Sequence, residues 1–368
     1  MRTILGFLLL ALLHLNPAAV QAADLKVETL ATGLDHPWSI AFLPDGRWLI
    51  AEKSGALRVY SDGALQAEAV AGVPPVYFAS QGGLFEVLPA PDFADSRLLY
   101  LSFAHGSRGQ NATRVVRARL DGNTLQELTP IFTAHPLKDT PVHYGGRMAW
   151  MGDGSLLLTL GDGYNYREQA QGLDNHFGKM VRIKADGSVP ADNPFVDQPA
   201  ALPEIYSYGH RNPQGLIVDG ERGLIYMHEH GPRGGDELNL LAPGKNYGWP
   251  AITYGIDYSG AVISPFTEMK GMEQPLTYWV PSIAPSGMAQ YRGELFAEWQ
   301  GDLLITALAE RSLRRIKLDP AGKVLGQEQL ELGINERLRA VSVAPDGAVI
   351  VLTDGAGGKL LRVTPAGD

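Results

Sequence analysis

The sequence predicts an all-β protein folded as one six-bladed β-propeller, and three observations support this. Strand-like segments rich in β-branched, leucine and aromatic residues recur along the chain, whereas amphipathic helices do not. A phrase of strand, tight turn and strand returns six times. The 43 glycines and 25 prolines are typical of a folded protein with many turns. A β-sandwich or two β domains is the alternative, because the repeats are unevenly spaced.

The first 22 residues form a separate segment. Arg2 gives a basic start, an apolar run covers residues 4–15, and Ala22 ends a small-residue motif, which together predict a signal peptide cleaved after Ala22. The run is shorter than the roughly 20 residues that a spanning helix needs. We therefore expect residues 23–368 to form a single domain without a membrane span, periplasmic or secreted; an uncleaved N-terminal anchor is the alternative.

The repeated phrase marks the predicted blades. Its clearest copy covers residues 39–52, where Pro44-Asp45-Gly46 separates two hydrophobic strands. The turn markers of the six copies are Asp45, Asp92, Asp153, Asp219, Gly301 and Asp346. They lie 45 to 82 residues apart, a spacing typical of propeller blades with loop insertions. Residues 25–32 precede the first copy and could supply the outer strand that closes the last blade.

Composition excludes several classes of function. The chain has no cysteine, so disulfides, thiolate zinc sites, iron–sulfur clusters and cysteine nucleophiles are excluded. Its net charge is −9 and no basic run exceeds two residues, so we expect no nucleic-acid partner. The glycine fingerprint of nicotinamide and flavin sites and the Gly-x-Ser-x-Gly elbow of serine hydrolases are both missing.

Two segments in the middle of the chain carry residues suited to catalysis. His143 directly precedes the third predicted blade, and Asp162 ends the hairpin that follows. A general base needs such a carboxylate, because it orients the imidazole and stabilises its cationic form. Arg211 and Asn212 lie in a tight turn ahead of a strand, where they are donors suited to a ligand oxygen. The alternatives are a surface histidine and a turn whose side chains cap their own backbone.

Two later segments combine charges with turns or strands. His228 and His230 share a strand face but lack a third ligand at a spacing that suits zinc, and carbonyls of the Gly231-Pro232 turn with nearby carboxylates suit calcium better. Arg337 and Arg339 alternate on a strand and point the same way, which predicts a clamp for a multiply anionic ligand. The alternatives are a solvated acidic loop and a solvated strand edge.

Seven segments, taken together in order, resemble the soluble pyrroloquinoline-quinone-dependent sugar dehydrogenases, and most closely their aldose sugar dehydrogenase branch. The resemblance extends from about residue 30 to residue 363. Each motif is weak by itself, whereas their joint order is specific. The segments are Gln81-Gly82-Gly83-Leu84, His143 with Gly146-Arg147, Gly161-Asp162, residues 209–215, Gly231-Pro232 with Asp236-Glu237, residues 246–250, and Arg337-Leu338-Arg339.

The resemblance implies an enzyme that oxidises an aldose at C1 to the lactone and transfers hydride to pyrroloquinoline quinone over the central channel. His143 would take the proton of the anomeric hydroxyl, Asp162 would orient His143, and Gln81 would lie beside the substrate hydroxyls. Arg211 would face the reacting oxygen of the quinone. The other implied cofactor contacts are Asn212, His230, Ser282, Arg337 and Arg339, of which the two arginines would hold carboxylates.

Calcium is also implied by the resemblance. One ion would be bound by main-chain oxygens of Gly231 and Pro232 together with the cofactor, and would act as a Lewis acid. A second, structural ion would use the Glu237 side chain and the Tyr247 backbone. The sequence does not identify the electron acceptor that completes the cycle.

The chain departs from the glucose dehydrogenase pattern at three positions. Val142 stands where an acidic residue precedes the base, Val280 replaces a tryptophan over the sugar, and Ala309 occupies the position of a cofactor-contacting lysine. Loss of the tryptophan and the acidic group removes contacts that distinguish sugars, so we expect a broad aldose range.

Two other functions compete at this point. One is a calcium-dependent propeller lactonase, and the other is a non-catalytic binding propeller that has lost the cofactor. Arg211, Arg337 and Arg339 count against the lactonase, because a neutral lactone does not need so many cations.

Overall fold

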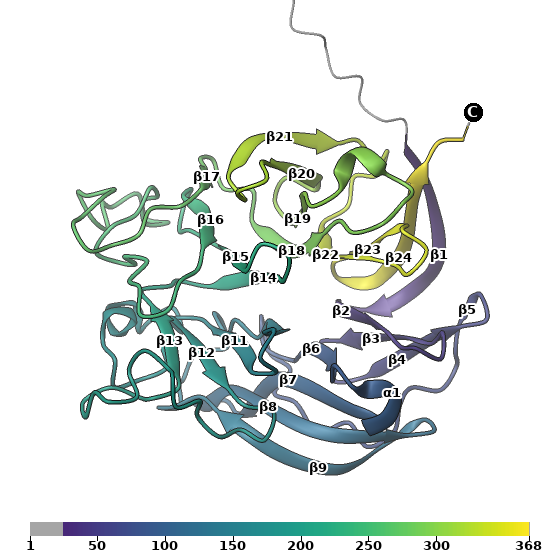
Figure 1. Ribbon diagram of the computed structural model, residues 1–368, viewed down its shortest axis with the longest axis horizontal. Helices are drawn as coiled ribbons and strands as arrows, with labels where there is room; N and C mark the ends of the chain where they lie inside the picture. Colours follow the sequence, from purple (N-terminus) through teal and green to yellow (C-terminus); the bar gives the residue numbers. More distant parts are fainter. Residues whose placement is uncertain (1–24, 368) are drawn as a thin grey trace, which may run out of the picture.

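The computed structural model describes residues 25–367 and consists of six four-stranded antiparallel sheets arranged in a ring (Figure 1). The predicted all-β six-bladed propeller is therefore confirmed. The predicted signal peptide, residues 1–22, lies outside the described residues. Within the described part, no helix is long and apolar enough to cross a membrane.

The first three blades follow one another along the chain. The first contains β2 (Pro37–Phe42), β3 (Trp48–Glu52), β4 (Leu57–Ser61) and β5 (Ala64–Leu65). The second contains β6 (Leu84–Pro89), β7 (Leu98–Ser107), β8 (Gln110–Asp121) and β9 (Thr124–Thr133). The third contains β10 (Met148–Trp150), β11 (Leu156–Leu160), β12 (Lys179–Ile183) and β13 (Ile205–Tyr208).

The next two blades repeat this order. The fourth contains β14 (Pro213–Asp219), β15 (Leu224–Glu229), β16 (Asp236–Leu240) and β17 (Thr277–Trp279). The fifth contains β18 (Pro285–Gln290), β19 (Leu303–Ala307), β20 (Leu313–Leu318) and β21 (Val324–Leu330). In Figure 1 the first strands of the blades, such as β2, β14, β18 and β22, lie nearest the centre of the ring.

The sixth blade joins the two ends of the chain. It contains β22 (Leu338–Val343), β23 (Val349–Thr353), β24 (Ala356–Pro365) and, outermost, β1 (Leu25–Asp35). The pairing of β1 with β24 is antiparallel and starts at Leu25 opposite Pro365. The predicted closing strand is confirmed, and its hydrogen bonds hold the first and last parts of the ring together.

The hydrophobic core lies between neighbouring blades. Leu49 and Leu57 of the first blade, for example, pack with Leu99 and Leu101 of the second. Because neighbours cover both faces of each sheet, the second strands β11, β19 and β23 are buried along their whole length rather than alternately. Six such interfaces close the ring.

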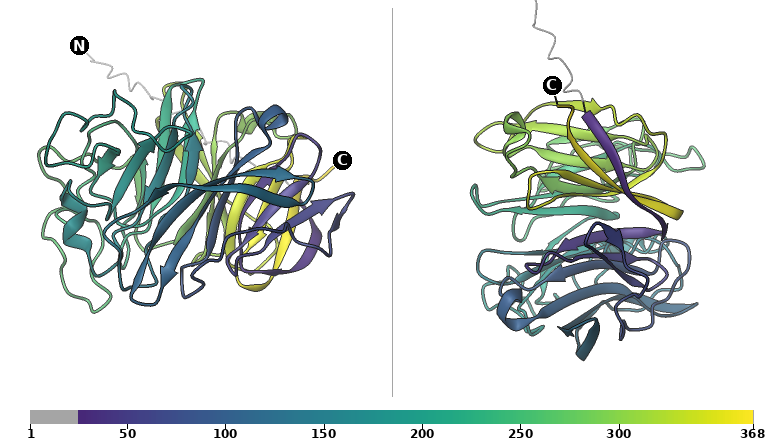
Figure 2. Two further views of the ribbon diagram at one scale, coloured as in Figure 1. Left: turned by 90° about the horizontal axis from the view of Figure 1, so that it is seen from below. Right: turned by 90° about the vertical axis from the view of Figure 1, so that its right-hand side faces the viewer.

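Strand direction gives the ring two distinct faces. Every marker turn lies between the first and second strands of its blade, with the short helix α1 (Phe93–Ser96) in the second turn and η2 (Ala297–Trp299) in the fifth. We call this end of the blades the turn face. First strands begin and second strands end at the opposite end, the site face. Figure 2 shows the strands running across the thickness of the ring between its two faces.

Two long connections enlarge the ring. Residues 161–178, which include η1 (Arg167–Gln171), follow the second strand of the third blade and therefore start on the site face. Residues 241–276 connect β16 to β17 and form the loops that project beyond these strands at the left of Figure 1.

Candidate active site

Segments far apart in the sequence meet on the site face because the first strands of all blades begin there. Gln81 precedes β6, His143 precedes β10, Asn212 precedes β14, and Arg337 precedes β22. The second strands end on the same face, and Asp162 and Asp354 lie within two residues of the ends of two of them. The propeller therefore gathers the predicted residues at one end of its channel.

His143 and Asp162 form the predicted pair. The Nδ1 atom of His143 lies 2.7 Å from Oδ1 of Asp162, and both side chains are buried. Trp249 donates its indole N–H to the other carboxylate oxygen at 2.8 Å, and Gln81 accepts the backbone N–H of His143 at 2.8 Å. Gly161 is required here, because an added Cβ would lie 2.4 Å from the carbonyl oxygen of His143.

Electrostatics favour a neutral imidazole at this position. Burial lowers the pKa of His143, a shift that the hydrogen bond and charge of Asp162 oppose in part. The charges of Arg211 and Lys138 lower this pKa further. With Nδ1 held by Asp162, Nε2 is the nitrogen that can accept a proton from a ligand. His143 also lines a cavity of about 290 Å³, which we call the base cavity.

A second cavity, of about 170 Å³, lies over the centre of the ring, and we call it the channel cavity. Its lining includes Asn212, His230, Arg337 and Arg339, which the resemblance assigns to the cofactor, and also Gln81, which the resemblance assigns to the substrate. Lys53 lines it too, and no carboxylate does so among the described residues. Burial, and next the charge of Arg211, hold the pKa of His230 well below its ordinary value, so this histidine adds no positive charge.

Asp354 positions both arginines of the clamp. Its carboxylate accepts Nε of Arg337 at 3.0 Å and Nε of Arg339 at 3.0 Å. Arg339 is 11% exposed and Arg337 is 49% exposed. Lys53 Nζ donates to the carbonyl oxygen of Ser80 at 2.7 Å and forms no ion pair with a carboxylate within residues 25–367. The cavity therefore presents excess positive charge to a ligand.

Arg211 connects the base cavity to the Gly231-Pro232 turn. Its guanidinium donates to the carbonyl oxygens of His230 and Gly231, and it lines the base cavity with Pro232. A carbonyl oxygen has two lone pairs, so Gly231 can accept Arg211 and still face a cation. The turn itself is held by Asp236, which accepts the amide of Gly231 at 2.9 Å.

The second predicted calcium site contains one buried carboxylate, one partly buried carboxylate and, next to them, an unsatisfied oxygen. Glu229, Glu237 and Tyr247 line one small cavity. Burial, and next the charge of Glu229, raise the pKa of Glu237 to about 8. Asn239 donates to Glu237 at 3.2 Å, and its own side-chain oxygen has no partner among the described residues. This oxygen-rich, carboxylate-bearing site fits a hard cation such as calcium.

One predicted residue lies outside these cavities, and several contributors were missed. The hydroxyl of Ser282 donates to Asp236 at 2.6 Å and lines none of the three cavities. The sequence reasoning missed Lys53, Asp354 and Trp249. Asp354 follows the second strand of its blade as Asp162 does, so comparison of the repeats would have found it.

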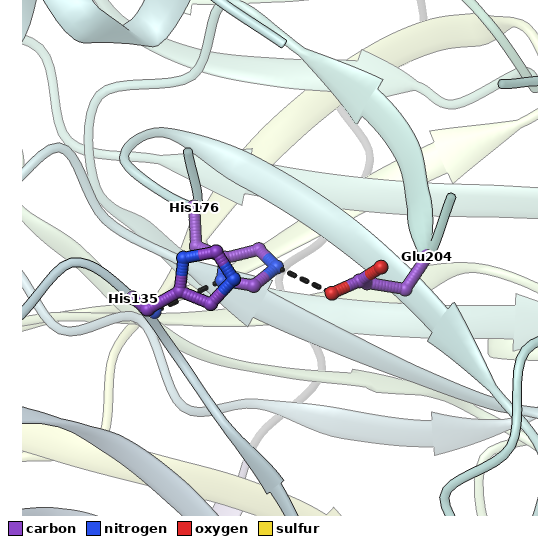
Figure 3. A group of neighbouring side chains, drawn as sticks. All are labelled: His135, His176 and Glu204. Carbon is purple, nitrogen blue, oxygen red and sulfur yellow. Dashed lines mark hydrogen bonds and ion pairs between the residues drawn. The ribbon is translucent and has the colours of Figure 1, made fainter. Parts of the chain in front are cut away.

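A zinc site at His228 and His230, which the sequence already disfavours, is not among the possible metal sites of the described residues. Within residues 25–367, the only three potential ligands close enough to share a metal ion are His135, His176 and Glu204 (Figure 3). Both ring nitrogens of His176 are already engaged, since Nδ1 accepts the amide of His135 at 3.0 Å and Nε2 lies 2.9 Å from Glu204. This group therefore acts as a hydrogen-bonded brace.

Comparison with known proteins agrees with this geometry. The family model described as Glucose / Sorbosone dehydrogenase matches residues 34–362. The chain belongs to this family. A relative named aldose sugar dehydrogenase YliI, from Escherichia coli strain K12, is 41% identical over 367 residues and covers 98% of each chain.

Solved structures of related proteins share the family fold. One described as glucose dehydrogenase is 48% identical, has a TM-score of 0.88, and covers 92% of this chain and 99% of its own. The PQQ-bound form of aldose sugar dehydrogenase from Streptomyces coelicolor is 28% identical, with a TM-score of 0.76 and coverage of 93% and 98%. Members of this family are oxidoreductases, so the predicted enzyme class is confirmed.

Proposed function

We propose that this chain is a quinoprotein dehydrogenase that oxidises aldoses at C1 to lactones. One observation carries the proposal. A buried general base, His143, is hydrogen-bonded to Asp162 and lies next to a cavity that is lined by Lys53, Arg337 and Arg339 and by no carboxylate of the described residues. A neutral base beside an anion-binding cavity suits removal of a proton from a sugar hydroxyl next to an acidic cofactor.

The protein residues divide into a proton-handling set and a holding set. Nε2 of His143 takes the proton of the anomeric hydroxyl, and Asp162 keeps the imidazole in the required tautomer and stabilises its cation. Trp249 in turn fixes Asp162. Gln81 already holds the backbone of His143 and would lie beside the substrate hydroxyls.

The positive charge of the channel cavity suits pyrroloquinoline quinone, which would supply the hydride acceptor when bound. Arg337 and Arg339 would hold its carboxylates, with Asn212 and His230 on the cavity wall and Arg211 facing it from the base cavity. Calcium at the Gly231 and Pro232 carbonyls would supply a Lewis acid, and a second ion would use Glu237 and the Tyr247 backbone. Ser282 would act indirectly, through Asp236.

Reconstitution tests the proposal. Purified apoprotein loaded with calcium and the quinone should reduce an artificial electron-acceptor dye when glucose is added, and the His143→Ala variant is the matched control. Because the base is missing, the variant should lose on the order of 10² to 10⁴ in turnover yet still bind the quinone. No dye reduction by fully loaded wild-type protein would contradict the dehydrogenase proposal, and unchanged turnover in the variant would remove His143 from the mechanism.

We further infer a broad sugar range. Val280 is 60% exposed and lines neither the base cavity nor the channel cavity, and Val142 offers no side-chain hydrogen bond to a sugar. Glucose, galactose, xylose and maltose should therefore be oxidised with kcat/KM values within about two orders of magnitude, or roughly 2.7 kcal/mol. Export after cleavage at Ala22 and an unidentified electron acceptor belong to the same proposal.

A further inference from the structure

The base cavity is lined not only by the proton-handling residues but also by residues to which the proposed mechanism gives no role. Two loops from different blades face each other across it, residues 162–171 of the third blade and residues 249–263 of the fourth. Arg167 Nη1 lies 3.7 Å from Oδ2 of Asp257 and connects the loops. Each loop places one largely exposed tyrosine on the cavity, Tyr164 or Tyr258.

Tyr164 is held in an unfavourable backbone conformation. Its φ is +68°, in the left-handed region that glycine or asparagine adopts more readily than an aromatic residue. Oδ1 of Asp162, which binds His143, also accepts the amide of Tyr164 at 2.7 Å. The phenol ring lies edge-on to His143 with ring centroids 5.3 Å apart and is still 48% exposed. The carboxylate that orients the base therefore also places an open aromatic face beside it.

Tyr258 approaches the cavity from the opposite loop. It lies in a turn that Asp257 stabilises by accepting the amide and hydroxyl of Ser259 at 2.9 and 2.7 Å. The ring lies 5.9 Å from the guanidinium carbon of Arg211, and the residue is 60% exposed. An aromatic ring this exposed, on a stabilised turn at the rim of a cavity, is available to a ligand.

The chemistry of the cavity walls fits a sugar ring. A pyranose has apolar C–H faces and hydroxyl groups around its edge, so it needs flat apolar surfaces above or below and polar groups at the side. Tyr164 and Tyr258 supply such surfaces, while Asn165, Arg167 and Asp257 supply donors and acceptors along the lining. Val280 provides no aromatic surface here.

We propose that Tyr164 and Tyr258 form an aromatic subsite that binds the pyranose rings of the substrate, taking the place of a platform at Val280. This inference rests on the proposed dehydrogenase function. Aromatic faces contact C–H groups that epimers share, so the subsite strengthens sugar binding with little discrimination between epimers. A disaccharide can occupy both tyrosines at once and should depend on them more than a monosaccharide does.

Steady-state kinetics of the reconstituted enzyme test the subsite. Tyr258→Ala should raise KM for maltose roughly 3- to 10-fold with little change in kcat, and Tyr258→Phe should retain most of the affinity because it keeps the ring. Tyr164→Asn removes the other ring while tolerating the left-handed backbone and should also raise KM. Quinone affinity, measured by quenching of tryptophan fluorescence, should stay at the wild-type value in all three.

Phe266→Ala is the matched control, because Phe266 is a half-exposed aromatic in the same connection that does not line the cavity. A KM for maltose within twofold of wild type in Tyr258→Ala, or an equal rise in Phe266→Ala, overturns the subsite. If the wild-type enzyme oxidises no sugar, saturation-transfer NMR of maltose with quinone-free protein tests sugar binding at the subsite independently of the dehydrogenase activity. Transfer that is lost in Tyr258→Ala supports the subsite, and transfer that is absent or unchanged overturns it.

Discussion

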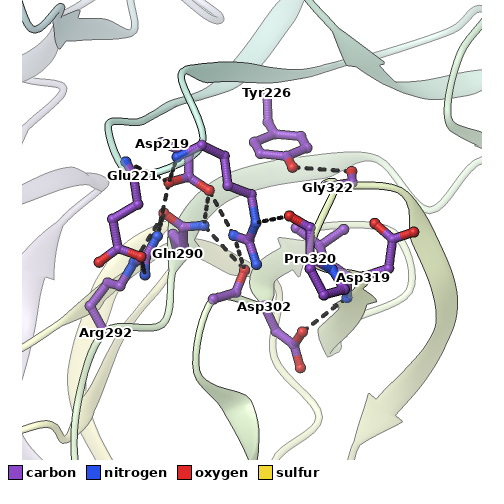
Figure 4. Close-up of polar contacts among 12 residues, drawn as sticks. Asp219, Glu221, Tyr226, Gln290, Arg292, Asp302, Asp319, Pro320 and Gly322 are labelled. Carbon is purple, nitrogen blue, oxygen red and sulfur yellow. Dashed lines mark hydrogen bonds and ion pairs between the residues drawn. The ribbon is translucent and has the colours of Figure 1, made fainter.

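On the turn face, the buried carboxylate of Asp219 accepts Gln290, Arg222 and Arg292 at 2.8, 2.7 and 2.9 Å (Figure 4). On the site face, the single carboxylate of Asp354 serves both Arg337 and Arg339, and Lys53 beside them has no acidic partner in residues 25–367. On the turn face, the charges of these side chains are therefore neutralised within the protein. On the site face, positive charge remains that an anionic ligand can neutralise.

The turn-face pattern is repeated around the ring. Marker aspartates pair with arginines of the same blade, for instance Asp45 with Arg47 at 2.8 Å and Asp346 with Arg362 at 2.6 Å. Burial alone would raise the pKa of Asp219, but hydrogen bonds from Gln290 and Arg222 and the charge of Arg292 lower it to about 2. Such satisfied groups stabilise the blade, while unpaired cations in a cavity indicate a ligand.

The largest expected effect is on the turn face. Asp219→Ala leaves Arg222, Arg292 and Gln290 without their shared acceptor, so we expect a loss of about 3 to 5 kcal/mol in the free energy of unfolding. Urea denaturation measures it, with Asp197→Ala, at an exposed position, as a control that stays within about 0.5 kcal/mol. Quinone affinity should not change.

The dependence of stability on pH also tests the role of the Asp219 carboxylate on the turn face. Its pKa in the folded protein, about 2, is below the ordinary value of 3.8, so its stabilisation is complete above pH 3.8. That contribution disappears as the pH falls through 3.8 towards 2. Asp219→Asn should therefore lose less stability than wild type over this interval, and an identical pH dependence would contradict the assignment.

The second effect is on the site face and should separate ligand binding from stability. Arg339→Ala and Arg337→Ala should each weaken quinone binding by about 1.5 to 3 kcal/mol, because each removes a charge-assisted hydrogen bond to a carboxylate. The more buried Arg339 should matter more. Titration can follow quenching of Trp38, which lines the cavity. Arg362→Ala, on the turn face, is the control, and wild-type affinity in both cavity variants would mean that these arginines form a solvated edge.

Local patterns in the sequence predicted the features that are formed within a single blade. The repeated turn phrase, the pairing of His143 with the following Asp162, and the shared direction of Arg337 and Arg339 all follow from strand geometry within one blade. The closing strand followed from the position of residues 25–32 before the first repeat.

Contacts between blades could not be read in this way. Lys53 and Arg339 lie near opposite ends of the chain and share a cavity only because the ring closes. Ser282 was assigned to the cofactor, but its hydroxyl binds Asp236, whose other donors are the backbone amides of residues 231, 283 and 284. Tyr258 belongs to an irregular connection whose course no periodicity predicts.

The smallest effect concerns Lys53, which lines the channel cavity although Ala309 stands where the resemblance places a lysine. Lysine is a compact charge with one hydrogen bond here, to Ser80, so Lys53→Met should weaken quinone binding by about 1 kcal/mol, less than an arginine variant. Burial, and next the charge of Arg339, lower the pKa of Lys53, so its charge is lost at a lower pH than that of a free lysine. As the pH rises, quinone affinity should therefore fall earlier for the wild type than for Lys53→Arg. Two results together would contradict this: the same dependence of quinone affinity on pH in the wild type and Lys53→Arg, and wild-type affinity in Lys53→Met. The ammonium of Lys53 would then bind only Ser80, and the arginines alone would hold the quinone.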